Sequence, residues 1–247
     1  MAKPDWRTWE ETAFACWPAL EQTDWAAGVL RASDGYTKRA NSANVLVDIN
    51  EGVDAVIAEG RAFFERRSLR PVFRLLSAVN HTALDRRLAE LGLAKVEPSL
   101  VMTMELSRSA AGSPAKSSAT ADWMQAYAEL SGNVDDPGHA KHRRMLDRLP
   151  TSRLLLVQCE GDRAIACGIG VIHRETVCLL DILVHPACRG RGVGQALVRD
   201  ILSWAAAQSA RWAMLQVLGT NIPAVRLYTR AGFERAYGYF YRVDKMG

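Results

Sequence analysis

The segment spanning residues 177–202 limits what this chain can fold into more than any other part of the sequence. It opens with a mainly apolar run, residues 177–184, which is short enough for one buried strand. A glycine-rich loop, residues 189–194, comes next, and apolar residues then recur at helical spacing. We therefore predict a buried strand, a glycine-rich loop and a helix in direct succession.

A loop of this kind at the start of a helix is suited to bind phosphate. The first amides of a helix have no partner within it, and the helix dipole favours negative charge there. Gly190, Gly192 and Gly194 would let a phosphate approach the main chain closely. Arg189 and Arg191 add planar guanidinium donors that match phosphate geometry. We therefore predict that the main-chain amides of this loop bind a diphosphate.

The glycine spacing excludes two common nucleotide-binding signatures. A P-loop carries Lys-Ser or Lys-Thr after its last glycine, where this chain has Gln195-Ala196. A dinucleotide fingerprint needs G-x-G-x-x-G, and the last interval here is too short. The pattern Arg189-x-x-Gly192-x-Gly194 instead resembles the loop with which the GNAT superfamily of N-acetyltransferases grips the pyrophosphate of acetyl-coenzyme A. The alternative is a basic, glycine-rich surface turn.

A second signature of the same superfamily follows further along the chain. It reads Asn221-x-x-Ala224-x-x-Leu227-Tyr228-x-x-x-Gly232-Phe233. Two patterns in the expected order indicate the family more strongly than either does alone. The resemblance implies that Asn221 and Tyr228 lie near the pantetheine and sulfur of the coenzyme. The coenzyme-binding residues predicted in this way are Ile182, Leu183, Val184, Arg189, Gly190, Arg191, Gly192, Val193, Gly194, Gln195, Asn221 and Tyr228.

Acetyl transfer to an amine needs a proton acceptor, an oxyanion donor and a proton donor for the thiolate. Tyr228 is the predicted acid, because its unperturbed pKa near 10 suits donation to a thiolate. A packed, hydrogen-bonded helix tyrosine is the alternative for this residue. A backbone amide within residues 182–184 is the predicted oxyanion donor.

The general base is where the chain departs from a common family pattern. Some members place a Glu twelve residues before the Tyr, and Gln216 stands there in this chain, which takes up no proton at neutral pH. Asp181 is the predicted base, because burial among apolar neighbours would raise its pKa. Glu175 and His173 are alternatives, as are a chain of waters and a purely structural role for Asp181.

A stretch rich in Ser and Ala, residues 107–121, divides the chain. We predict a first domain over residues 1–106, this linker, and an acetyltransferase domain over residues 122–247. The expected fold class is α/β, with a mixed sheet and helices on both faces. The family often begins with one further strand, which residues 96–105 would supply.

The two halves resemble each other. Leu84-x-x-x-Leu88-x-x-x-Gly92-Leu93 parallels the end of the second signature, which predicts two tandem GNAT-like units. An unrelated α/β domain is the alternative. Residues 47–52 stand where the first unit would carry its loop and lack the arginine–glycine pattern. We expect the first unit to be a non-catalytic partner that holds no coenzyme.

The first unit also contains a predicted hairpin. Trp25 to Ala32 predicts a strand, Asp34-Gly35 its turn, and residues 36–47 the partner strand. Polar groups are dense over residues 31–42. We interpret them first as a solvated turn, and otherwise as a substrate-facing or inter-domain surface.

Composition and sequence patterns limit which compartment and which partners we expect for this protein. The chain has 247 residues, 49% of them hydrophobic, and a net charge of +4, too weak to indicate nucleic acid. The lack of a signal-like or membrane-spanning apolar run predicts a soluble, cytoplasmic protein without a membrane partner. Its five cysteines have no zinc-like spacing. His139-x-x-His142 beside Asp135-Asp136 is a weak metal pattern, so no metal is expected.

The predicted function is an acetyl-CoA-dependent N-acetyltransferase. Direct attack in a ternary complex would move the acetyl group to a primary amine, and a small-molecule acceptor is favoured over a protein N-terminus or a lysine. The alternative from another class is a coenzyme A sensor or scaffold without catalysis, which Gln216 motivates. Assembly as a homo-oligomer stays open.

Overall fold

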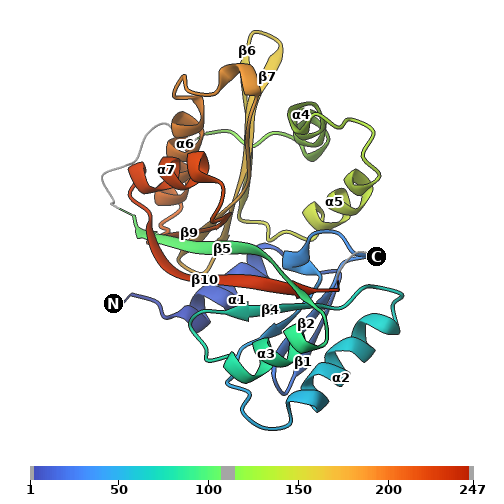
Figure 1. Ribbon diagram of the computed structural model, residues 1–247. Coiled ribbons are helices and arrows are strands. Elements are labelled where there is room, and N and C mark those ends of the chain that lie inside the picture. The colour runs from blue at the N-terminus through green and yellow to red at the C-terminus, as the bar shows by residue number, and fades with distance from the viewer. Residues whose placement is uncertain (1–2, 107–114, 245–247) are drawn as a thin grey trace. The chain divides into compact units, whose positions relative to one another are not determined.

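The computed structural model describes residues 3–106 and 115–244. Its contacts divide the chain into two compact units, which are described separately (Figure 1). The C-terminal unit holds the residues up to 16, residues 102–217 and residues 221–234. The N-terminal unit holds residues 17–101, residues 218–220 and the residues from 235 onward.

This division differs from the predicted one at both ends of the chain. The first helix, α1 (Trp6–Cys16), belongs to the C-terminal unit, in which Trp9 is buried. Most of the last strand, β10 (Glu234–Val243), belongs to the N-terminal unit. The predicted domains, residues 1–106 and 122–247, are therefore wrong for these two elements. Each of them packs with residues that are distant in the sequence.

The predicted linker, residues 107–121, falls partly on residues 107–114, which lie outside the described residues. The part that follows is attached to the C-terminal unit. The Ser117 hydroxyl accepts a hydrogen bond from the Leu155 amide at 3.0 Å, and the Ser118 amide donates to the Leu155 carbonyl at 2.8 Å. Helix α4 (Thr120–Ser131) begins directly afterwards, so the linker is shorter than predicted.

The N-terminal unit is a mixed sheet with strand order β1-β2-β3-β4-β10-β5. Strand β2 is antiparallel to both β1 and β3, whereas β4 is parallel to β3 and β10 is antiparallel to β4. The elements that precede β10 in this unit are β1 (Glu21–Trp25), β2 (Gly28–Ala32), β3 (Ser42–Val45), α2 (Val53–Glu65), β4 (Val72–Leu76), α3 (Thr82–Glu90) and β5 (Ala94–Glu105). Apolar side chains from both helices and from β2, β3 and β4 form its core.

The predicted hairpin of this unit is partly wrong. Trp25 pairs with Gly28, so residues 26–27 form a tight turn inside the predicted strand. Ala26-Ala27 carries no turn signal, which is why the sequence did not indicate it. Gly28 is needed there, because a Cβ would lie 2.2 Å from the Asn44 carbonyl oxygen. The predicted partner strand, residues 36–47, shortens to β3 and follows a loop that contains the 3-10 helix η1 (Lys38–Ala40).

Some polar residues of this loop are buried and others, Asp34 and Thr37 among them, are exposed, so the interpretation as a solvated turn is only partly correct. Arg31, Ser33 and Asn41 are each no more than 5% exposed. The Asn41 side-chain oxygen accepts from the amides of Ser33 and Gly35, both at 3.1 Å, and Arg31 donates to the Arg39 carbonyl at 2.8 Å. These side chains thus hold the loop itself, while the other interpretation, a recognition surface, stays a prediction.

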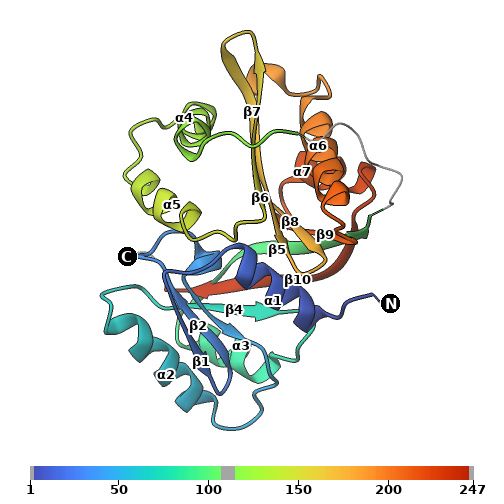
Figure 2. The ribbon, with the colours of Figure 1, turned by 180° about the vertical axis from the view of Figure 1, so that it is seen from behind.

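In the C-terminal unit, the strands follow one another in the order β5-β9-β8-β7-β6. Strands β6, β7 and β8 are successively antiparallel, and β9 is parallel to β8. Figures 1 and 2 show α4 and α5 on one face of these strands and α6 and α7 on the other, which confirms the predicted fold class. Its elements after α4 are α5 (Gly138–Leu146), β6 (Arg153–Glu160), β7 (Arg163–His173), β8 (Thr176–Val184), η3 (Pro186–Cys188), α6 (Val193–Ala207), β9 (Trp212–Leu218) and α7 (Ile222–Arg230).

The predicted further strand over residues 96–105 is present as part of β5. Strand β5 lies beside β9, and the Leu106 amide just after it donates to the Arg211 carbonyl at 2.8 Å. The strand passes from the N-terminal unit into the C-terminal unit after Val101.

The repeat inferred from the sequence is visible in the order of the elements. Both halves run through three antiparallel strands, a helix, a parallel strand, a helix and a final strand. Helices α3 and α7 also end in the same way. The Leu93 amide donates to the Leu88 carbonyl and the Phe233 amide to the Tyr228 carbonyl, each at 3.0 Å. This agreement supports two tandem units of one fold.

Candidate functional site

Strands β8 and β9 separate at one end of the C-terminal sheet. Their parallel pairing runs from Thr176 opposite Trp212 to Leu179 opposite Leu215. Beyond these residues, the described parts of the two strands no longer pair. The burial of β8 changes at nearly the same place, from buried over residues 176–180 to half-buried over residues 181–184. The main chain predicted to provide the oxyanion donor therefore lies along an unpaired strand edge.

The predicted phosphate loop follows this edge directly. Gly192 is the N-cap of α6 with a φ of 81°, and Gly190 has a φ of 75°. Both values are left-handed, a conformation that glycine adopts without strain. The Ala196 amide donates to the Gly192 carbonyl, which begins the helical pattern. Among the described residues, no acceptor lies in good hydrogen-bonding geometry to the amides of residues 190–195. These amides are available for an anion.

The three glycines of the loop have different roles. A Cβ on Gly190 or Gly192 would meet nothing within 4 Å, so these two positions leave open space at the amides. A Cβ on Gly194 would lie 3.3 Å from Leu227 of α7 and 3.4 Å from Val184 of β8. The role of Gly194 in phosphate approach stays a prediction, and this glycine also has a packing role. It lets α6 lie close to both α7 and the end of β8.

The two arginines of the loop point in different directions. The Arg189 Nε donates to the Val184 carbonyl at 3.2 Å, which ties the loop to the end of β8. The Arg191 guanidinium lies 3.2 Å from a Glu160 carboxylate oxygen and 3.8 Å from the Cys188 sulfur. Both side chains are exposed. The structure thus brings both arginines to the loop, with Arg191 held by an acidic partner.

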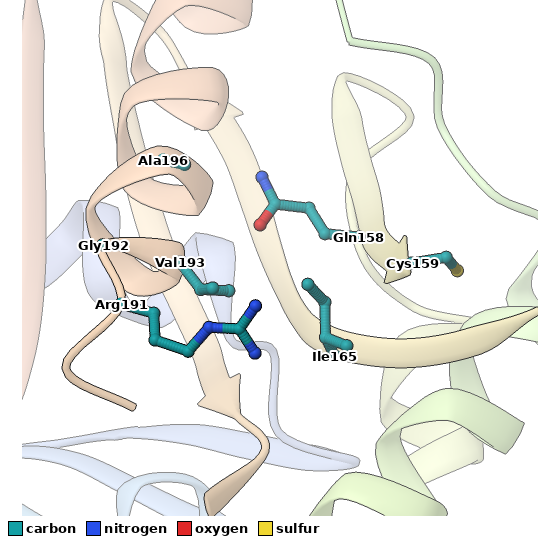
Figure 3. Close-up of a pocket in the computed structure, with 7 residues that line it drawn as sticks. All are labelled: Gln158, Cys159, Ile165, Arg191, Gly192, Val193 and Ala196. Atoms are coloured by element: carbon teal, nitrogen blue, oxygen red, sulfur yellow. The ribbon is translucent and has the colours of Figure 1, made fainter. Parts of the chain in front are cut away.

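A pocket of about 460 Å³ adjoins the start of α6. Figure 3 shows the Arg191 side chain extending from the loop before α6 towards Ile165 on β7. Its lining residues are Gln158, Cys159, Ile165, Arg191, Gly192, Val193 and Ala196. A concave surface that includes the basic Arg191 therefore lies beside the loop.

The second predicted signature forms helix α7. The Asn221 side-chain oxygen accepts from the Ala224 amide at 3.2 Å, so Asn221 is the N-cap of the helix. Tyr228 is 7% exposed, and its ring centroid lies 6.0 Å from that of Phe233. The contact between Gly194 and Leu227 places the residue before Tyr228 against the phosphate loop. The two sequence signatures therefore meet in space.

The predicted base, Asp181, lies on β8 at the point where the strand edge becomes half-buried. One of its carboxylate oxygens is 2.9 Å from Nε2 of His142 on α5. Glu175 and His173 lie at the opposite end of the same strand pair, and Glu175 is 3.9 Å from Arg211. At about 3.3 Å per residue, roughly 20 Å of strand separates Glu175 from Asp181. Both alternatives are therefore remote from the loop.

Sequence reasoning missed the importance of His142. The pattern His139-x-x-His142 suggested only a weak metal site. The His142 side chain is fully buried, whereas His139 is half-buried. A signal was present, because Met145 and Leu146 follow at the spacing of one buried helical face. Within the described residues, no group of three or more His, Cys, Asp or Glu side chains is placed so that it could hold a metal ion.

Two cysteines lie close to these groups. Cys188 is 4% exposed, so its thiol is too buried to react readily with a reagent in solution. Burial, together with the charge of Asp181, raises the pKa of the Cys167 thiol. All five cysteines are free thiols, and Cys159, at the pocket, is exposed. Only Cys159 is thus accessible to a reagent in solution.

The corresponding loop of the N-terminal unit has a related backbone but different chemistry. Gly52 is the N-cap of α2 with a φ of 65°, as Gly192 is for α6. Asp48 and Glu51 stand nearby instead of arginines, and Asp48 accepts from the Asn80 amide at 2.9 Å. Two carboxylates would repel a diphosphate. The first unit therefore retains the turn without the charge that suits a coenzyme.

Comparison with known proteins agrees with this description. The model of the acetyltransferase (GNAT) family matches residues 119–233. The uncharacterized N-acetyltransferase YobR of Bacillus subtilis (strain 168) is 29% identical over 250 residues, covering 98% of this chain and 99% of that protein. Streptothricin acetyltransferase of Streptomyces lavendulae is 40% identical over 78 residues, which is 31% of this chain and 41% of that protein.

A solved structure supports the fold over nearly the whole chain. The GCN5-related N-acetyltransferase from Kribbella flavida has a TM-score of 0.72 and 15% identity, and the match covers 97% of this chain and 95% of that one. Fold, loop and relatives together define an acyltransferase of the N-acetyltransferase class. Within that class, residues 119–233 match the acetyltransferase (GNAT) family. In the described part of the chain, no helix combines the length and apolar character needed to cross a bilayer.

Proposed function

We propose that the protein transfers the acetyl group of acetyl-CoA to a primary amine by direct attack in a ternary complex. One observation carries this proposal. The free amides of residues 190–195, the unpaired edge of β8 and the helix of Tyr228 meet around Gly194. The loop amides can bind a diphosphate, and the unpaired edge of β8 can form hydrogen bonds with an extended ligand that carries amide groups.

The proposed coenzyme site uses the loop and both strand ends. The amides of residues 190–195 would hold the diphosphate, and Arg189 and Arg191 would offset part of its charge. The main chain of residues 182–184 would pair with the pantetheine, and Asn221 would fix the start of α7 beside it. Bound acetyl-CoA supplies the thioester and its acetyl group. These assignments follow from the positions of the residues in an arrangement typical of the superfamily.

The chemistry requires three groups of this chain. Asp181 accepts a proton from the substrate ammonium, which leaves the amine lone pair free to attack the carbonyl carbon. An amide of residues 182–184 donates to the oxygen on which negative charge develops. The Tyr228 hydroxyl gives its proton to the departing sulfur as the carbon–sulfur bond breaks. The nitrogen loses its second proton, which restores the Tyr228 hydroxyl, and Asp181 returns the first proton to solvent. A new amide, a free thiol and one proton are the products.

A small, cationic acceptor suits the surroundings of Asp181. Its side chain is 20% exposed, which allows contact with a small ammonium group. The relation to streptothricin acetyltransferase, named for a small-molecule acceptor, agrees with this choice. A protein N-terminus or a lysine side chain carries the same amine, so an acceptor panel should include both alongside diamines and aminoglycosides.

The test measures binding and turnover separately. Calorimetry with acetyl-CoA reports the affinity, and release of free thiol reports turnover with each amine. Replacement of Tyr228 by Phe should lower kcat at least 10-fold, as expected when a general acid is lost, and leave the coenzyme Kd within about 2-fold. Tight binding without turnover in either form would support the sensor instead. Absence of binding would refute the whole proposal.

A further inference from the structure

The side chain of His142 lies directly behind the proposed base. We propose that His142 is a positioning residue, which holds the Asp181 carboxylate in the orientation that accepts the proton of the amine. This inference rests on the proposed function, because it assumes that Asp181 acts as the base. It assigns a role to a residue that neither sequence signature contains.

An irregularity of the sheet turns Asp181 towards α5. Cys167 pairs with Leu183 and Ile169 pairs with Leu180, so Asp181 and Ile182 both lie opposite Gly168. This is a β-bulge, a device that re-aims a side chain. Asp181 has a φ of 49°, a left-handed value that is unfavourable for a residue with a Cβ. Such a conformation persists only where the surroundings fix it.

The His142 ring is fixed by two aromatic neighbours. Its centroid lies 4.6 Å from that of Tyr127 and 5.7 Å from that of Trp123, both in edge-to-face geometry. The Trp123 indole N–H in turn donates to the Gly168 carbonyl at 3.2 Å. Gly168 is the residue opposite the bulge, so α4, α5 and the bulge form one closed set of contacts. A ring held in this way can act as a rigid donor.

Exposure distinguishes the roles of the two partners. The His142 side chain is 0% exposed and that of Asp181 is 20% exposed, so a substrate can reach the carboxylate but not the imidazole. The distance of 2.9 Å between Nε2 and Oδ2 assigns the Nε2–H as the donor to the carboxylate. Among the described residues, His142 is the one hydrogen-bond partner of Asp181, which leaves the second oxygen to the amine.

The test compares four variants by kcat, KM and acetyl-CoA affinity across the pH range in which activity is measurable. His142→Phe removes the donor and keeps a planar ring, and His142→Gln retains an uncharged N–H donor. Asp181→Asn removes the base. His173→Gln is the matched control, because it makes the same change at the remote end of the strand pair. The titratable groups near Asp181 are His142 on α5 and Cys167 on β7, and Tyr127 on α4 contacts the His142 ring; none of the four variants alters Cys167 or Tyr127.

We expect Asp181→Asn to lower kcat about 100-fold, the lower range for loss of a general base. His142→Phe should lower kcat about 10-fold and displace the acidic limb of its pH profile, with the coenzyme Kd unchanged. His142→Gln should recover most of this loss, and His142→Phe should have no further effect in the Asp181→Asn background. A merely structural histidine would change the melting temperature without moving the pH profile.

Each contrary outcome has a distinct meaning. Full activity and an unchanged profile in His142→Phe, with a large loss in Asp181→Asn, would overturn the positioning role and keep the proposed function. If His142→Phe does not fold, a His142→Gln enzyme slowed as much as Asp181→Asn would overturn it as well. Full activity in Asp181→Asn would remove the base and this inference together. Wild-type protein that neither binds acetyl-CoA nor releases thiol would refute the proposed function itself.

Discussion

Replacement of Gly192 by Ala tests the phosphate loop through its backbone alone. Gly192 has a φ of 81°, and an added Cβ would meet nothing within 4 Å. The substitution therefore introduces no clash, and its effect is the cost of a left-handed conformation, about 1–2 kcal/mol for a residue with a Cβ. The free loop can relax to avoid this cost, but the arrangement that presents the amides of residues 190–195 requires it.

If the cost is paid on binding, the acetyl-CoA Kd should rise about 5- to 30-fold, since about 1.4 kcal/mol corresponds to a factor of ten. Gly132→Ala is the matched control. Gly132 ends α4 with a φ of 75°, and its Cβ would also meet nothing within 4 Å. Gly132→Ala should lower thermal stability without changing the coenzyme affinity, whereas Gly192→Ala should keep its thermal stability and bind the coenzyme more weakly in calorimetry. Equal coenzyme affinity in both variants and the wild type would refute the loop as the site.

Three further predictions concern the rest of the chain. Gly28→Ala should prevent the N-terminal sheet from forming normally, because its Cβ would lie 2.2 Å from a backbone oxygen. Circular dichroism should show a lower melting midpoint for this variant than for Gly35→Ala, whose Cβ would lie 3.6 Å from the nearest atom, on Leu69. Burial lowers the pKa of His81 in the folded protein, so below its ordinary pKa this histidine binds more protons in the unfolded chain than in the folded one. The free energy of unfolding should therefore decrease as pH falls through about 6.5. Urea titrations at several pH values should show a smaller decrease in His81→Gln. A thiol reagent should modify Cys159 rapidly in the folded protein and the buried Cys167 only after unfolding, and equal rates for both would contradict the described burial.

The features that could be predicted from the sequence are those that depend on neighbouring residues. The glycine and arginine spacing after β8 predicted a loop at the start of a helix with amides open to an anion, and the structure has the N-cap at Gly192 followed by such amides. The Asn221 signature predicted a helix, and the structure explains the asparagine as its N-cap. Both depend on hydrogen bonds within a few residues, for which amino-acid preferences carry direct information.

The features that were missed depend on distant partners. Asp181 and His142 are 39 residues apart, and their contact requires a bulge that no residue preference indicates. The membership of α1 and β10 was missed for a related reason. Periodicity shows that an element has an apolar face, but it does not show which sheet will bury that face. The turn at residues 26–27 was not predicted, because two alanines form it and alanine is not a typical turn residue.

The exchange of α1 and β10 means that this protein cannot be split into two self-sufficient halves. A backbone cut within residues 107–114 would leave α1 on the first fragment, although its folding partners lie on the second. The second fragment would retain β10, whose antiparallel neighbour β4 lies on the first. Each piece would hold an element that completes the other, so complementation by co-expressed fragments is possible, whereas either fragment alone would expose an unfilled sheet. Two tandem units joined in this way depend on each other to fold.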